Sequence, residues 1–202
     1  MNKEILLKNW GPCLAEFILE KNQIEQINKL CSKDASKDFR KSLAGQLEHE
    51  YKIDHNKLEE ILRTELEAYK FAYKQHHGNA LRDNQKIKVV SAWVNYMQAG
   101  DFNPPHIHHS CDLSAVLYLD IPQKLKDENK NDISNGGGPG DIVFFLSGSA
   151  GDMVNQHQIF PRDYSMFIFP FNLTHLVNPY KSKVERVSVA FNMIWEEIKN
   201  KK

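Results

Sequence analysis

The segment Asn103-Pro104-Pro105-His106-Ile107-His108 carries two imidazoles separated by one residue. Side chains of an extended chain alternate with period two, so His106 and His108 point to the same side. Neutral imidazole is the commonest transition-metal ligand among protein side chains. His175, far along the chain, can complete a triangle of ligands if the fold brings distant strands together. These three histidines predict a mononuclear metal site.

Arg186 follows the third histidine by eleven residues. Arginine is the preferred partner of a carboxylate, because its planar guanidinium can donate two parallel hydrogen bonds. Three protein ligands on one face of an octahedral ion leave three positions open. We therefore expect a metal that binds and activates a small acid together with oxygen.

Other side chains compete for the same roles. Asp112 could replace His108 as the third ligand if the loop between them turns back. His109 would point to the opposite side of an extended segment from His108. The remaining histidines are expected to be surface or hydrogen-bonded residues, namely His49, His55, His76, His77 and His157.

The overall composition limits the class of protein. Of the 202 residues, 41% are hydrophobic and 26% charged, as in an ordinary soluble domain. The formal net charge is zero, which gives no support to nucleic-acid binding. No apolar run is long enough for a membrane span, and the one near the N-terminus is too short for a signal peptide. Three widely spaced cysteines argue against disulfides, so we expect a cytoplasmic protein.

The chain divides into a helical first third and a strand-rich remainder. Apolar residues at helical spacing predict one helix over 12–31 and a second over 54–76, with Asp54 as N-cap and Gly78 after its end. The polar stretch 32–53 is predicted to be a loop. We expect a single domain over 1–202, with 1–85 as a helical support region and 86–195 as the core.

From residue 86 onward the hydrophobic pattern is typical of strands. Short runs rich in Val, Ile, Tyr and Phe, without intervening helices, predict an antiparallel sandwich or barrel backed by the two helices. A long polar connection over 123–140 is expected to be mobile or functional. The predicted strands cover 87–97, 113–121, 142–146, 165–169 and 185–193.

Two of these strands have one apolar and one mixed face. Along 185–193 the mixed face holds Arg186, Ser188, Ala190 and Asn192. Along 113–120 it holds Ser114, Val116, Tyr118 and Asp120. A mixed face is solvated in many two-layer sheets, but beside a candidate metal site it favours a polar pocket.

An ordered set of motifs extends over about residues 87–193. It consists of Trp93-Val94-Asn95-Tyr96, Gly100, Asn103, His106-x-His108, Leu113-Ser114, Leu117-Tyr118-Leu119, Phe169-Pro170, Thr174-His175, Asn178-Pro179, Arg186-x-Ser188 and Phe191-Asn192. This set resembles the 2-oxoglutarate- and Fe(II)-dependent oxygenases. It looks most like the bacterial and phage members that carry His-x-His, and it is more distantly similar to the prolyl hydroxylases.

The resemblance implies a mainly β fold, a double-stranded β-helix (jelly-roll) of two antiparallel sheets, with the site in its mouth. It implies Fe(II) bound by His106, His108 and His175, with His108 in place of the usual aspartate. It also implies 2-oxoglutarate as cosubstrate, O2 as oxidant, and hydroxylation of a substrate with release of succinate and CO2. In relatives the far carboxylate of 2-oxoglutarate is bound by the residue at the place of Arg186, and the cosubstrate pocket is lined at the places of Tyr96, Tyr118 and Ser188.

Two other functions remain open at this point. A cupin-type metal enzyme or small-ligand binder would share His-x-His and a distal histidine, but it would not require Arg186. A metal-free interaction protein could keep the same fold. The prime substrate is not visible in the sequence; a protein, a peptide or a small metabolite is compatible with it. Exposed strand edges and the first helix could support a homodimer.

Overall fold

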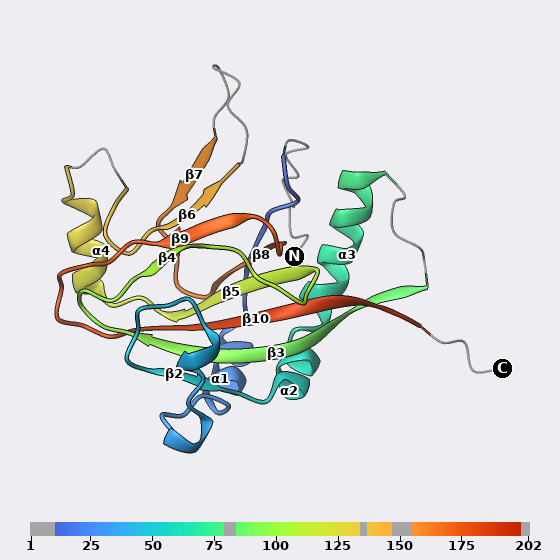
Figure 1. Cartoon of the computed structure of the whole chain (residues 1–202), viewed down its shortest axis with the longest axis horizontal. Coiled ribbons are helices and arrows are strands. Elements are labelled where there is room, and N and C mark those ends of the chain that lie inside the picture. Colours follow the sequence, from blue (N-terminus) through green and yellow to red (C-terminus); the bar gives the residue numbers. More distant parts are fainter. Residues whose placement is uncertain (1–10, 79–83, 134–136, 147–154, 199–202) are drawn as a thin grey trace.

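Two antiparallel sheets face each other in the computed structural model, which describes residues 11–78, 84–133, 137–146 and 155–198 (Figure 1). The larger sheet has the strand order β1-β8-β5-β10-β3-β2, and the smaller has the order β4-β9-β6-β7. All of the pairings are antiparallel, so the predicted jelly-roll of two sheets is confirmed. The strands are β1 (Ala15–Ile18), β2 (Glu50–Lys52), β3 (Gln85–Met97), β4 (Asn103–His106), β5 (Leu113–Asp120), β6 (Ile142–Phe145), β7 (Gln156–Ile159), β8 (Ser165–Pro170), β9 (Thr174–Val177) and β10 (Arg186–Glu197).

Helices cover the outer face of the larger sheet (Figure 1). They are α1 (Lys21–Asn28), α2 (His55–Ile61) and α3 (Arg63–His77). Their buried side chains, including Ile27, Leu58 and Tyr69, join those of β3, β5 and β10 in one hydrophobic core. A second hydrophobic cluster lies between the two sheets and includes Phe144 and Phe169. The outer core therefore supports the sheet, and the inner face remains available for a site.

The helix predicted over 12–31 is wrong in its first half. Residues Ala15–Ile18 form β1, which pairs with β8 at the edge of the larger sheet, and α1 begins only at Lys21. The backbone N–H of Glu20 donates to Gln23 Oε1 at 3.0 Å, which caps the start of this shorter helix. An apolar spacing of a few residues fits a strand as well as a helix turn, and the pairing with β8 decided between them.

The second predicted helix is present in two pieces. Asp54 caps α2 by accepting from the backbone of Asn56 and Lys57, as predicted. Leu62 departs from helical geometry (φ −93°, ψ 8°) between α2 and α3, and Gly78 ends α3 in the left-handed region, as expected for a C-cap glycine. The predicted loop 32–53 contains two 3-10 turns, Ala35–Lys37 and Arg40–Ser42, and also β2.

The five predicted strands are confirmed, and four further elements after residue 86, the helix α4 (Gln123–Lys130) and the strands β4, β7 and β9, were not predicted. The connection 123–140 begins with α4, which buries Leu125 as its one apolar anchor. Strands β4, β7 and β9 span only four residues each, too short for a clear alternation. Among the described residues, no helix is both long and apolar enough to cross a membrane.

Candidate metal and cosubstrate site

Three histidines meet where β4 pairs with β9. His106 and His175 are Cα partners in this antiparallel pair, so their side chains lie side by side. His108 follows two residues later, and its backbone N–H donates to Phe171 O at 3.0 Å, which holds this turn against the chain before β9. The ligand atoms of the three rings all lie within 4.8 Å of one another. The sequence prediction that these residues could meet thus agrees with the geometry.

Backbone carbonyls fix the orientation of two of the rings. His106 Nδ1 lies 2.8 Å from Pro104 O, and His175 Nδ1 lies 2.9 Å from Leu173 O. A carbonyl can only accept, so each Nδ1 carries the proton and each Nε2 keeps its lone pair. This is the arrangement by which proteins commonly orient a metal-binding imidazole.

Burial keeps all three imidazoles in the neutral form that binds metal. It lowers the pKa of His175 to about 3 and that of His108 to about 4, and the neighbouring histidines add to both effects. Burial also lowers the pKa of His106, partly offset by its bond to Pro104 O. The Nε2 atoms of His108 and His175 are 3.3 Å apart. Two nitrogens bound to one ion at about 2.1 Å each would be roughly 2.9–3.4 Å apart, so this donor set fits a single transition metal.

Asp112 is not part of this group. Its Oδ2 accepts from the backbone N–H of Trp195 at 2.8 Å, so the carboxylate is bound to the end of β10. The group of metal-ligating side chains found in the described part of the chain therefore consists of imidazoles alone. His49 and His76, which were not assigned to the site, bond instead to Tyr51 Oη and to Gly11 O.

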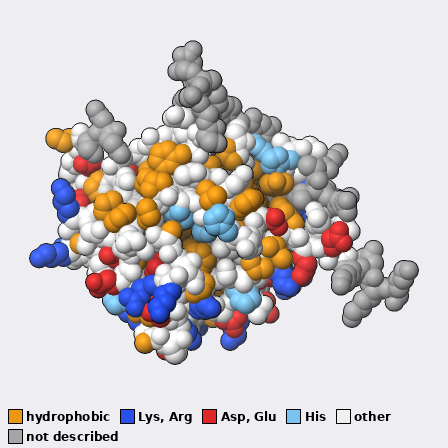
Figure 2. Space-filling model, viewed as in Figure 1, with side chains coloured by type: hydrophobic (Ala, Val, Ile, Leu, Met, Phe, Trp, Pro, Cys, Tyr) orange, Lys and Arg blue, Asp and Glu red, His pale blue; other side chains and the backbone are white. Residues whose placement is uncertain are grey.

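The three imidazoles open into a cavity of about 720 Å³ between the two sheets. Its walls come from β3, β5 and β10 of the larger sheet, from β4, β6 and β9 of the smaller sheet, and from the segment 39–50. Figure 2 shows histidine side chains near the middle of this face of the molecule, with hydrophobic side chains around them. The volume is in the range of cavities that enclose a small ligand.

The alternation predicted for β10 is confirmed. Arg186, Ser188, Ala190 and Asn192 all line the cavity, whereas Phe191 lies in the outer core. From β5, Val116 and Tyr118 of the predicted mixed face also line the cavity. The strands that carry the polar side chains thus form the floor of the site.

Arg186 is a buried cation with unused hydrogen-bonding capacity. It is 2% exposed, donates to Gly140 O at 2.6 Å through Nη1, and contacts Met97 Sδ at 2.8 Å through Nη2. Within the described ranges, neither its Nε nor the hydroxyl of Tyr118 has a hydrogen-bond partner. The Tyr118 ring centroid lies 5.1 Å from the guanidinium carbon. None of the ion pairs among the described residues involves Arg186. A buried guanidinium without a carboxylate partner is suited to an anionic ligand.

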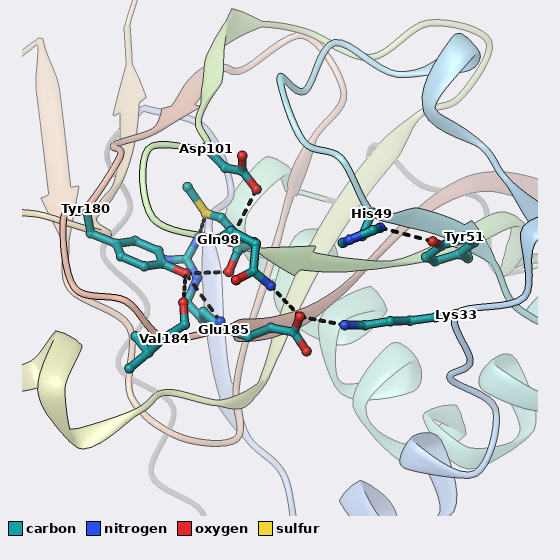
Figure 3. Close-up of polar contacts among 10 residues, drawn as sticks. Lys33, His49, Tyr51, Gln98, Asp101, Tyr180, Val184 and Glu185 are labelled. Atoms are coloured by element: carbon teal, nitrogen blue, oxygen red, sulfur yellow. Dashed lines mark hydrogen bonds and ion pairs between the residues drawn. The ribbon is translucent and has the colours of Figure 1, made fainter.

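Hydrogen bonds of Tyr180 and Glu185 fix the backbone next to Arg186. Tyr180 donates its hydroxyl proton to Met97 O and accepts from the backbone N–H of Arg186 (Figure 3). Glu185 is bound to Gln98 and to Lys33, whose Nζ lies 2.6 Å from the carboxylate (Figure 3). These contacts fix the start of β10 against the end of β3, so the guanidinium enters the cavity from a rigid strand.

The structure does not bring Tyr96 to the cavity. Trp93, Asn95 and Met97 of β3 line the cavity, so alternation places Tyr96 on the other face. There its ring packs edge-on against Tyr51, with Lys33 Nζ 4.7 Å from its centroid. We therefore leave Tyr96 out of the cosubstrate site.

Two buried polar residues that line the cavity were missed by sequence reasoning, Glu50 and Asn95. Asn95 could have been found, because it shares the alternation of Trp93 and Met97. Glu50 gave no signal, since it lies in a polar stretch that was predicted to be a loop.

Comparisons with known proteins agree with this fold and identify the family. The model of the family described as "Putative 2OG-Fe(II) oxygenase" matches residues 91–192. The search of the curated proteins found no significant match. The chain resembles a Pseudomonas putida prolyl-4-hydroxylase (15% identity, TM-score 0.56, 91% of this chain and 92% of that one). It also resembles an oxidoreductase of the 2OG-Fe(II) oxygenase family from Burkholderia pseudomallei (12% identity, TM-score 0.56, 90% of this chain and 84% of that one). A third similar structure is a Trichoplax adhaerens prolyl hydroxylase (11% identity, TM-score 0.57, 90% of this chain and 83% of that one).

At these identities the solved structures establish the fold alone, a jelly-roll shared with non-haem iron enzymes. The family model covers half of the chain, including all three histidines and Arg186. The chain belongs to the 2-oxoglutarate- and Fe(II)-dependent oxygenases. It is an enzyme that uses Fe(II), 2-oxoglutarate and O2, and the cupin-type and metal-free interpretations of the sequence are not retained.

Proposed function

We propose that this oxygenase hydroxylates a prime substrate and releases succinate and CO2, with His106, His108 and His175 as the iron ligands. One observation carries the proposal. The three ligand nitrogens lie within 4.8 Å of one another and share a cavity with the buried Arg186, whose Nε has no partner among the described residues. When bound, Fe(II) supplies the activation of O2 that is coupled to decarboxylation of 2-oxoglutarate.

Arg186 and Tyr118 are proposed to bind the far carboxylate of 2-oxoglutarate. The unpaired Nε of Arg186 and the unpaired hydroxyl of Tyr118 are both donors, and a carboxylate oxygen accepts from either. Ser188 lies next to Arg186 along the same face of β10 and can donate a further hydrogen bond. Together these buried groups would orient the cosubstrate, and hydrogen bonds made by buried groups are stronger than bonds in water.

The apolar part of the cavity restricts water around the reacting groups. Ile142, Phe169 and Val177 line it beside the histidines. The segment 39–45 forms another part of the wall and is the nearest candidate for contact with the prime substrate. The Trichoplax structure of the same fold holds a peptide fragment, which supports a protein or peptide segment as the substrate of this chain. We propose that residues 1–202 act as a single oxygenase domain, because β1 and β2 of the first third complete the larger sheet.

The assignment is tested by removing one imidazole at a time. His106→Ala and His175→Ala are expected to lose Mn(II) binding under anaerobic conditions and Fe(II)-dependent formation of succinate from 2-oxoglutarate. His157→Ala is the matched control, because His157 is exposed on β7 outside the cavity. Wild-type succinate formation by either cavity variant would contradict the ligand assignment.

A further inference from the structure

Four buried polar side-chain atoms lack a hydrogen-bond partner among the described residues, and all four belong to residues that line the cavity. They are Glu50 Oε2, Asn95 Oδ1, Tyr118 Oη and Arg186 Nε. Buried polar groups in folded proteins are nearly always paired, and an unpaired one lowers stability. The presence of all four unpaired atoms in one cavity therefore indicates that bound ligands supply their missing hydrogen-bond partners.

The four atoms divide by their chemistry. The hydroxyl of Tyr118 and the Nε of Arg186 donate, and the proposed cosubstrate accounts for both. Asn95 Oδ1 and the ionised form of Glu50 Oε2 only accept, so a carboxylate such as that of 2-oxoglutarate does not pair with them. Hydrogen-bond donors of a second bound molecule would satisfy both atoms.

The strand register separates these two groups. Glu50 of β2 is the Cα partner of Asn95 in β3. Asn95 is in turn the partner of Ser188 in β10, and Ser188 is the partner of Tyr118 in β5. The side chains of Glu50, Asn95, Ser188 and Tyr118 thus form one row across the floor of the cavity, and Arg186 lies two residues before Ser188 on the same face of β10. Neighbouring strands are about 4.8 Å apart, so the two ends of the row are roughly 14 Å apart. That spacing leaves room for 2-oxoglutarate at one end and a second molecule at the other.

Glu50 is the only carboxylate among the described residues that line the cavity, and it is 2% exposed. Burial raises its pKa to about 7, although Arg40 partly opposes this. The Arg40 guanidinium is itself bound to Asp38, with Nη2 2.7 Å from Oδ2. No ion pair among the described residues includes Glu50. A carboxylate buried without a cationic partner is costly, so a cationic ligand would stabilise it strongly.

We propose that Glu50, with Asn95 beside it, binds a cationic nitrogen group of the prime substrate, an ammonium or a guanidinium. This inference rests on the proposed function, because the second molecule is assigned as the substrate of the same iron site. Either cation offers several N–H donors together with a positive charge, and it therefore satisfies both acceptors and the carboxylate charge. An apolar or acidic substrate group would leave these atoms unpaired.

The test measures binding of small probes to the full chain loaded with Mn(II) and 2-oxoglutarate. Nα-acetyl-lysine amide and Nα-acetyl-arginine amide are the cationic probes, and Nα-acetyl-norleucine amide is the neutral one. Fluorescence of Trp93, which lines the cavity two residues from Asn95, reports binding, and a Trp93→Phe variant identifies its signal. At least one cationic probe is expected to bind about tenfold or more tightly than the neutral probe, as a charge-assisted hydrogen bond implies.

Glu50→Met is expected to abolish this preference without loss of thermal stability, because it replaces an unpaired buried charge by an apolar chain of similar length. Glu50→Gln removes the charge alone and serves the same test if the methionine variant does not fold. Glu48→Gln, at an exposed position two residues earlier, is the control and should keep the preference.

Equal binding of cationic and neutral probes, or an unchanged preference in the Glu50 variants, overturns the inference. Weaker binding of Mn(II) or 2-oxoglutarate by the Glu50 variants also overturns it, because Glu50 would then serve the metal and cosubstrate. Failure of the wild-type protein to bind 2-oxoglutarate with Mn(II) would refute the proposed function instead.

Discussion

Replacement of Arg186 by methionine separates the binding of 2-oxoglutarate from the stability of the fold. The guanidinium is buried, and its Nε has no hydrogen-bond partner in the part of the chain that the structure describes. One charge-assisted hydrogen bond contributes about 1.5–3 kcal/mol, and truncation of one member of a buried charge pair costs about 2–5 kcal/mol. A loss near 3 kcal/mol weakens 2-oxoglutarate binding roughly 100-fold.

The stability of the ligand-free protein should change little in the same variant. Methionine removes the 2.6 Å hydrogen bond from Nη1 to Gly140 O, which costs about 1 kcal/mol. It also removes a buried charge that has no carboxylate partner, and this change is commonly neutral or stabilising. The two effects oppose each other, so we expect the free energy of unfolding to stay within about 1 kcal/mol, or a Tm shift of about 2–4 °C at most.

The assay is quenching of Trp93 fluorescence by 2-oxoglutarate in the presence of Mn(II). The Trp93 ring centroid lies 6.2 Å from that of His108, close enough to report on occupation of the site. Arg162→Met is the matched control, because Arg162 is exposed and pairs only with Glu16 at the surface. If Arg186→Met binds 2-oxoglutarate with unchanged affinity, the far carboxylate of 2-oxoglutarate is bound elsewhere. A large fall in Tm with the weakened binding would mean that Arg186 mainly supports the fold.

Three further predictions test neighbouring groups. Tyr118→Phe should weaken 2-oxoglutarate binding about tenfold by loss of one hydroxyl donor to a carboxylate, measured by the same quenching assay; unchanged binding would remove Tyr118 from the site. His108→Asp should retain Mn(II) binding, and the Mn(II) affinity should depend less on 2-oxoglutarate, as titrations with and without the cosubstrate would show. Asp112→Asn should change neither the Mn(II) affinity nor its dependence on 2-oxoglutarate. Tyr69→Phe should lower the free energy of unfolding by about 1–2 kcal/mol, because the buried Tyr69 hydroxyl donates to Cys13 O at 2.8 Å. Thermal unfolding should show a Tm about 2–8 °C lower. An unchanged Tm would contradict this prediction.

Local periodicity explains which parts of the site could be predicted. His106 and His108 lie two residues apart on an extended segment, and Arg186 and Ser188 do so on β10, so alternation alone places each pair on one face. The same rule, applied to β3, would have placed Asn95 in the cavity and Tyr96 outside it. The resemblance to a family suggested Tyr96, but the alternation of its own strand decides its position.

Tertiary pairing explains the parts that were missed. The short strand β2 lies in a polar stretch, and only its register with Asn95 of β3 turns Glu50 into the cavity. Strand β4 contains Pro104 and Pro105, which argue against a strand in any local pattern, yet it pairs with β9. Segment 15–18 forms a strand because its backbone pairs with β8. In each case the deciding partner is more than 40 residues away in the sequence.

The proposed all-imidazole ligand set would change the charge balance of this cavity. In a set with one carboxylate, the protein itself neutralises part of the charge of a divalent ion. His106, His108 and His175 are neutral, because burial lowers their pKa values. In the proposed site, negative charge beside the ion would come from the acid group of 2-oxoglutarate, and Arg186 would balance its other carboxylate. Metal and cosubstrate should therefore each raise the affinity of the other by the same factor, since coupling between two bound ligands is reciprocal. A carboxylate at position 108 would supply that charge from the protein and weaken the coupling.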